Sequence, residues 1–193
     1  MTERDTTGSV PSIVFTLVFR APTGLVQPRT LRELLTTTAL PDSLTDRLNI
    51  AQALAKSVSY VHTFGFVHKN LRPEAFICFS DPRTGTFTIG GQSVYLVGFE
   101  SFRKEEGRTH RTGDDAAEGN LYRYPSRRGY GPREDYIMQH DIYSLGACLL
   151  EVGLWHSFIE YSDRDQAPIL ADHLGISDKT GPEATHQLKE FGK

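Results

Sequence analysis

The sequence has little of what would indicate a membrane, secreted or nucleic-acid-binding protein. No apolar run approaches the ~20 residues needed to span a bilayer. The first residues, Met1 to Ser9, are polar, so we expect no signal peptide there. The net charge of -3 offers no excess of positive charge for nucleic acid or acidic membranes. At 193 residues, the chain is expected to form one globular domain. We expect this domain to bind neither nucleic acid nor membranes.

Cysteine is also scarce. Cys78 and Cys148 are the two cysteines, and they occur in the apolar contexts F-I-C-F and G-A-C-L-L. This pattern predicts two reduced thiols in the core and a cytoplasmic protein. The seven histidines are scattered without the spacing typical of metal ligands, so the sequence predicts no metal site.

The first half of the chain predicts two strands and two helices after a disordered lead-in at residues 1–12. Ile13 to Phe19 is β-branched and aromatic, which predicts a strand covered on both sides. Thr30 to Leu35 has capping-box spacing and predicts a short helix. Ser43 to Phe64 predicts a longer helix ended by Gly65. Its expected apolar stripe comprises Leu44, Leu48, Ala51, Leu54, Ala55, Val58 and Val61.

The second half is less regular. Ala75 to Phe79 and Val94 to Val97 predict a strand pair, with an extra strand at residues 86–89 in the connection. Glu100 to Asn120 has mixed charge and few apolar residues, which predicts a mobile loop. Ile142 to Leu154 is apolar around most of its circumference and predicts a central buried helix. Short helical pieces are expected at residues 172–175 and 183–191.

The segment His68-Lys69-Asn70-Leu71-Arg72-Pro73-Glu74-Ala75 resembles the catalytic loop of protein kinases, H-R-D-L-x-x-x-N. Other segments resemble further kinase motifs in the same order. They are the strand entering the hinge (13–19), the hinge (20–24), the D-F-G segment (94–103), the A-P-E segment (121–126) and the start of the central helix (141–146). In detail, the chain is similar to divergent fungal kinase-like domains.

The resemblance implies an α+β fold, mainly α with small β-hairpins. It covers the kinase large lobe over residues 13–155, from the hinge strand to the central helix, without the small lobe. Residues 156–193 are then expected to form an irregular or partly helical tail. No glycine-rich loop and no V-A-I-K lysine are found in the sequence.

The positions that perform chemistry in kinases are degenerate. Asn70 stands at the position of the aspartate base, and Ala75 stands at that of the metal-binding asparagine. Gly98, Phe99 and Glu100 stand at the D-F-G positions. An amide has no useful basicity near pH 7, and neither alanine nor glycine offers Mg²⁺ an oxygen from its side chain. The resemblance therefore implies a pseudokinase with no catalytic residues, no cofactor and no metal.

The positions that match the kinase catalytic loop, including Arg72, imply that the loop keeps its geometry. His68 is expected to pack and hydrogen-bond at the base of the loop, and Asp141 to accept backbone N–H bonds from it. If ATP and Mg²⁺ bind at all, the hinge-like Arg20 and Ala21 and the pocket-floor position Phe76 would contact the nucleotide.

Three groups of residues could each have a function. In each case we favour the simpler interpretation, that they are surface residues in contact with solvent. Glu74 and Glu100 lie beside the vacant metal positions and are candidates for displaced ligands. Thr109 and Thr112 lie among basic residues and are candidate phosphorylation sites. The basic residues with aromatic neighbours that would suit single-stranded nucleic acid are Arg123, Arg127 and Arg128.

A large lobe without its small lobe exposes an apolar rim, expected around Phe15, Phe19, Phe76 and Phe99. We expect a protein partner, a second copy or a separate small lobe to cover this rim, so that the domain acts by protein interaction. The alternatives are a protein kinase or ATP-binding phosphotransferase with unusual residues, and a truncated product without function.

Overall fold

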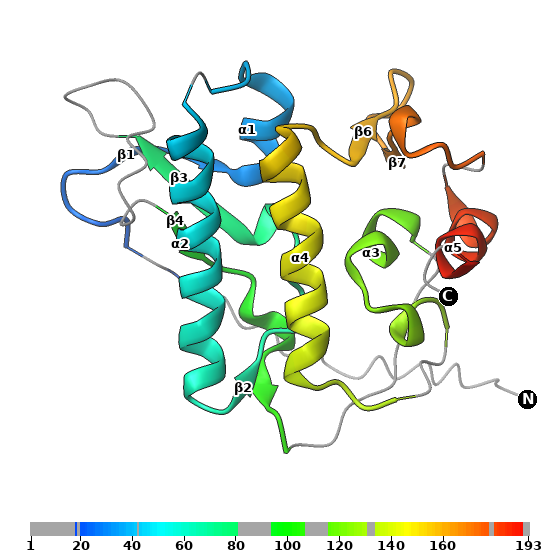
Figure 1. The fold of residues 1–193 in the computed structure, drawn as a ribbon, viewed down its shortest axis with the longest axis horizontal. Coiled ribbons are helices and arrows are strands. Elements are labelled where there is room, and N and C mark those ends of the chain that lie inside the picture. The colour runs from blue at the N-terminus through cyan, green and yellow to red at the C-terminus, as the bar shows by residue number, and fades with distance from the viewer. Residues whose placement is uncertain are drawn as a thin grey trace, which may run out of the picture.

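Two long antiparallel helices, α2 (Leu44–Thr63) and α4 (Met138–Leu154), lie side by side at the centre of the protein (Figure 1). The computed structural model describes residues 18, 20–41, 43–80, 94–106, 116–130, 134–177 and 180–190. At one end of the helix pair, Arg47 donates a hydrogen bond to the carbonyl of Gly153. At the other end, the imidazole of His62 lies 3.1 Å from the carboxylate of Asp141. None of the described helices is both long enough and apolar enough to cross a membrane.

The expected starts of the first two helices are confirmed, because local hydrogen bonds decide them, whereas α4 begins at Met138 and not at the expected Ile142. Helix α1 (Leu31–Thr37) begins where the Thr30 hydroxyl accepts a bond from the Glu33 N–H at 3.1 Å. Ser43 caps α2 in the same way. Gly65 follows the end of α2 with φ of +73°, a left-handed conformation that favours glycine.

Three small antiparallel sheets accompany the helices. In the first, β3 (Phe76–Ser80) lies between β1 (Val26–Thr30) and β4 (Val94–Leu96), with Phe76 opposite Leu96. Strand β2 (Phe66–Val67) pairs with β5 (Arg103–Lys104). Strand β6 (Ile159–Tyr161) pairs with β7 (Pro168–Leu170). The expected pairing of the segments at 75–79 and 94–97 is confirmed.

The strand expected at residues 13–19 lies outside the described residues except for Val18, which is exposed and not in a strand. The extra strand expected at 86–89 and the lead-in at 1–12 also lie outside them. Strand β1 was not expected, and it is irregular: Pro28 lacks an N–H and Gln27 has a positive φ of 51°. The register of β1 against β3 shifts between Val26 and Arg29, where these two residues lie.

The remaining elements are short. Helices α3 (Ala117–Tyr122) and α5 (Gly181–Glu190) pack against each other beside α4 (Figure 1). Single 3-10 turns are η1 (Pro73–Ala75), η2 (Phe99–Ser101), η3 (Pro125–Arg127) and η4 (Asp172–Leu174). With five α-helices and small antiparallel sheets in the described chain, the fold is mixed and consistent with the expected α+β class.

The outcome for the less regular regions is mixed. The helical pieces expected at residues 172–175 and 183–191 are present as η4 and α5, whereas the strands β6 and β7 were not expected. This part of the chain places Ile159, Leu170, Ile176 and Leu188 in the main hydrophobic core. The segment Glu100 to Asn120 is not a loop throughout, since it contains most of η2, all of β5 and the start of α3. Residues 107–115 of this segment, with Thr109 and Thr112, lie outside the described residues.

The expected apolar faces of the long helices were partly wrong. In α2, Leu44 and Leu48 are exposed by 60% and 59%, whereas Ile50, Leu54 and Val58 are buried. Helix α4 is not buried all round. Its exposed apolar residues are Ile142, Leu150 and Leu154. Helical spacing alone does not determine which of two apolar stripes faces the core.

The core also contains a buried ion pair between Arg32 of α1 and Glu151 of α4, which are 2% and 0% exposed. Tyr122 donates a hydrogen bond to Glu151 at 2.9 Å, and the N–H of Phe158 donates another at 2.8 Å. Arg32 also donates to Glu74 at 3.1 Å. Burial lowers the pKa of Arg32, but these neighbouring groups outweigh it and raise the pKa above its usual value, so the guanidinium stays charged.

We expect Arg32→Met to lower the free energy of unfolding by about 3–5 kcal/mol, because it leaves the buried Glu151 without its cation. Urea denaturation measures the change. The double variant Arg32→Met/Glu151→Leu should recover part of the loss, since it removes both buried charges. Arg164→Met, at an exposed arginine, is the control and should change stability by no more than about 0.5 kcal/mol. A loss below about 1 kcal/mol in Arg32→Met would contradict the assignment.

Candidate functional site

The segment His68 to Ala75 connects β2 to β3 and is held at its start by Asp141, in the first turn of α4. The Asp141 carboxylate accepts hydrogen bonds from the N–H of His68 at 2.7 Å and of Lys69 at 3.0 Å. It accepts a further bond from the Tyr136 hydroxyl at 2.7 Å. Asp141 is fully buried, so these donors replace the water that its charge has lost. The hydrogen bonds expected between Asp141 and the loop are present.

His68 fixes the other side of the loop. Its Nε2 lies 2.9 Å from the carbonyl of Val97, and its Nδ1 lies 3.4 Å from the backbone nitrogen of Asn70. These contacts fit one neutral tautomer, which donates from Nε2 and accepts at Nδ1. Burial is the largest influence and lowers the pKa of His68, although the bond to Val97 opposes it. The ring packs edge-on against Phe99 at 5.0 Å.

Four of the positions that the kinase resemblance implies to be degenerate, Asn70, Ala75, Gly98 and Glu100, meet at one place in space. The point that a Cβ would occupy on Gly98 lies 3.8 Å from the Cβ of Ala75 and 3.8 Å from the amide nitrogen of Asn70. The carboxylate of Glu100 lies 3.6 Å from the same point. Three of the four positions therefore present an amide, a methyl group and bare backbone. The fourth, Glu100, supplies the one carboxylate among them.

Glu74 does not accompany Glu100 as a candidate ligand. Its carboxylate accepts a bond from the buried Arg32 and lies 3.9 Å from the Nε of Arg72, and its side chain is 33% exposed. Glu74 is therefore part of an ion-pair network. It was expected to be a solvated surface carboxylate, with a displaced metal ligand as the alternative, and its contacts fit neither. Within the described chain, this loop contributes to no group of three or more metal-ligating side chains.

The expectation that Phe76 forms part of an exposed apolar rim was wrong. Phe76 is 0% exposed and belongs to the core. Phe99 is half-buried against His68, while Phe15 and Phe19 lie outside the described residues. The hinge-like Arg20 and Ala21 are exposed.

The arginines after α3 form hydrogen bonds with other groups of the protein. Arg127 and Arg128 are 5% and 6% exposed. Arg128 donates to the carbonyl of Asn120 at 3.0 Å and to the hydroxyl of Tyr143 at 2.7 Å. Arg123 donates to the side chain of Asn120 at 3.0 Å. Their guanidinium groups are engaged by the protein, which explains the basic run without a nucleic-acid site.

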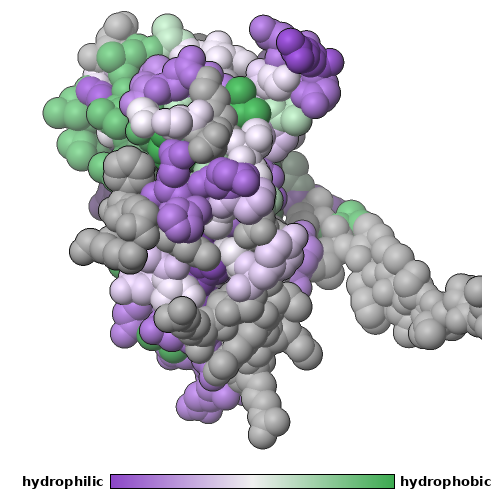
Figure 2. Space-filling model, turned by 90° about the vertical axis from the view of Figure 1, so that its right-hand side faces the viewer, coloured by the Kyte–Doolittle hydropathy of each residue, from purple (hydrophilic) through white to green (hydrophobic). Residues whose placement is uncertain are grey.

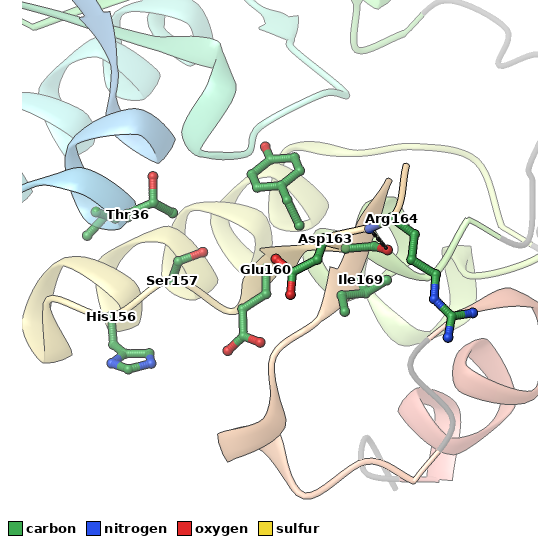
Figure 3. A pocket seen from close by; sticks show the side chains of 10 residues that line it. Thr36, His156, Ser157, Glu160, Asp163, Arg164 and Ile169 are labelled. Atoms are coloured by element: carbon green, nitrogen blue, oxygen red, sulfur yellow. Dashed lines mark hydrogen bonds between the residues drawn. The ribbon is translucent and has the colours of Figure 1, made fainter. Parts of the chain in front are cut away.

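A cavity of about 700 Å³ lies elsewhere, between α1 and the β6–β7 hairpin (Figure 3). Its walls come from α1, the segment that follows α4 and the β6–β7 hairpin. The lining includes Thr36, His156, Ser157, Glu160, Asp163 and Arg164. No sequence motif indicated this cavity, because its walls come from segments that are far apart in the chain.

Comparisons with known proteins add no assignment: no protein-family model matches the chain, and no curated protein matches it significantly.

We expect Asp141→Ala to lower the free energy of unfolding by at least about 2 kcal/mol, because it leaves two backbone N–H groups of the loop without their acceptor. Urea denaturation measures this loss. Asp163→Ala, at an exposed aspartate of the β6–β7 turn, should stay within about 0.5 kcal/mol of the unmodified protein. Equal stability of both variants would show that Asp141 does not hold the loop.

Proposed function

We propose that the chain is a catalytically inert, kinase-like large lobe that acts by binding another protein. One observation carries the proposal: Asn70, Ala75 and Gly98 converge on one point while Asp141 and His68 keep the loop in place. This arrangement is what the kinase resemblance implies for a loop that retains its shape and has lost its chemical groups.

The chemistry of phosphoryl transfer supports inertness. A kinase needs a base that receives the proton of the substrate hydroxyl and oxygen ligands that hold Mg²⁺ against the phosphates. Loss of a general base alone typically costs ~10²–10⁴ in rate. Asn70 is no base, and Ala75 and Gly98 provide no side-chain oxygen.

An exposed apolar surface supports binding to a protein. It comprises five leucines, here called the leucine surface, that are 54–62% exposed at one end of the α2–α4 pair: Leu40, Leu44, Leu48, Leu150 and Leu154. Figure 2 shows apolar atoms gathered at the upper left of the face that it draws, at the height of the C-terminal end of α4 in Figure 1. Several large apolar side chains exposed near one another favour a protein interface.

We expect millimolar Mg-ATP to leave the unfolding temperature of the purified chain unchanged. A ligand at 100 times its dissociation constant adds about 2.7 kcal/mol to stability, so binding would raise the midpoint measurably. Thermal unfolding with Mg-ATP, with ATP alone and with Mg²⁺ alone makes the comparison. A rise that requires both ATP and Mg²⁺ would contradict inertness.

One observation favours the alternative of an unusual ATP-binding phosphotransferase. The carboxylate of Glu100 lies at the point where the degenerate positions meet, where it could replace the missing metal ligand. If a Mg-ATP-dependent rise occurs and Glu100→Gln abolishes it, Glu100 is that ligand and the alternative holds.

We expect Leu48→Ser/Leu154→Ser to reduce binding of an apolar dye and any self-association of the chain, because it removes exposed apolar area from the leucine surface. Dye fluorescence and light scattering coupled to size exclusion measure both. Phe64→Ser, at a 74% exposed residue at the opposite end of α2, is the control. A monomer that binds no dye at high concentration would contradict the proposed interface, as would equal effects of the two changes.

A further inference from the structure

Two histidines and a glutamate form a compact cluster beside the cavity. His156, Glu160 and His173 each offer one ligand atom, and these three atoms lie within 4.8 Å of one another. His156 follows the end of α4, Glu160 lies in β6, and His173 lies in η4 after β7. The two imidazole rings are 4.1 Å apart between their centres and stand at 78°. The cluster therefore joins three segments of the chain.

The backbone that carries the cluster is fixed by its own hydrogen bonds. The N–H of His156 donates to the carbonyl of Glu151 at 3.1 Å. Glu160 lies opposite Ile169 in the β6–β7 ladder. The N–H of Ala171, just before η4, donates to the carbonyl of Phe158 at 3.0 Å. The three side chains are thus held near one another without any ligand, and only their rotamers need to adjust to bind one.

We propose that His156, Glu160 and His173 bind a divalent transition-metal ion of the zinc class. Two imidazoles and one carboxylate are a ligand set that Zn²⁺ uses in proteins, with water at the fourth tetrahedral position. Bonds of about 2.0–2.1 Å place tetrahedral ligand atoms about 3.4 Å apart. The present separation of up to 4.8 Å requires a movement of about 1 Å, which solvent-accessible side chains can make.

The composition of the cluster favours a cation. An ion between the two rings would lie beside the carboxylate of Glu160, whose ligand atom is within 4.8 Å of those of both histidines. A carboxylate is an anionic oxygen ligand, so it favours a positive ion at this place.

The position of the cluster leaves access to solvent. His156 and Glu160 both line the cavity, and Figure 3 shows them beside each other at its edge. The cavity gives a metal ion a route of entry and leaves room for the water at the fourth position. This inference does not depend on the proposed function, because none of its residues belongs to the His68–Ala75 loop.

The test is titration of the full chain, freed of metal by a chelator, with Zn²⁺ in an isothermal calorimeter. We expect one ion per chain, and each of His156→Ala, Glu160→Gln and His173→Ala should weaken binding at least about tenfold. The controls are His186→Ala and Glu183→Gln, at exposed positions on α5, which should bind Zn²⁺ as the unmodified chain does.

Circular dichroism of each metal-free variant shows whether the fold is kept, so that loss of binding can be assigned to the ligands. The three cluster residues are outside the main hydrophobic core, and we expect unchanged spectra. Absence of Zn²⁺ binding by the unmodified chain would overturn the proposal. Binding that the cluster variants leave unchanged, or that the controls weaken equally, would overturn it too.

Discussion

The structure depends most on the buried ion pair between Arg32 and Glu151. Removing each charge from water costs several kcal/mol, so the pair is tolerated only because other polar groups complete its hydrogen bonds. Those groups come from α3, η1 and the entrance to β6, through Tyr122, Glu74 and the N–H of Phe158. Five segments must therefore meet correctly around Arg32. A packing error in any of them would leave a charge buried without its partner.

The same network lies between the two sites. Glu74 immediately precedes Ala75, one of the degenerate positions, and Ser157 immediately follows His156 of the metal-ligating cluster. Arg32 donates hydrogen bonds to both Glu74 and Ser157. One guanidinium group thus contacts a side chain next to each of the two sites, while Asp141 and His68 hold the loop itself.

The sequence was informative wherever a local hydrogen bond or turn decides the structure. The caps at Thr30, Ser43 and Gly65 follow from three to five consecutive residues, and the bonds of Asp141 followed from the kinase resemblance. The sequence could not show which apolar face of α2 is buried, because that depends on α4. Strands β6 and β7 have three residues each, too few for an alternating pattern. His156 and His173 come together only through the pairing of those strands.

The proposed loss of catalytic groups is compatible with an intact loop, because different residues would supply the chemistry and hold the loop. The hydrogen bonds that hold the loop involve Asp141, His68 and backbone atoms. Asn70, Ala75 and Gly98 could therefore lose their chemical groups without unfolding the loop. At Gly98 the φ of +82° lies in the left-handed region, which glycine adopts without strain and aspartate tolerates better than most other residues. The backbone at this position therefore does not by itself explain why a glycine is present, and what the glycine removes is the carboxylate that could bind a metal.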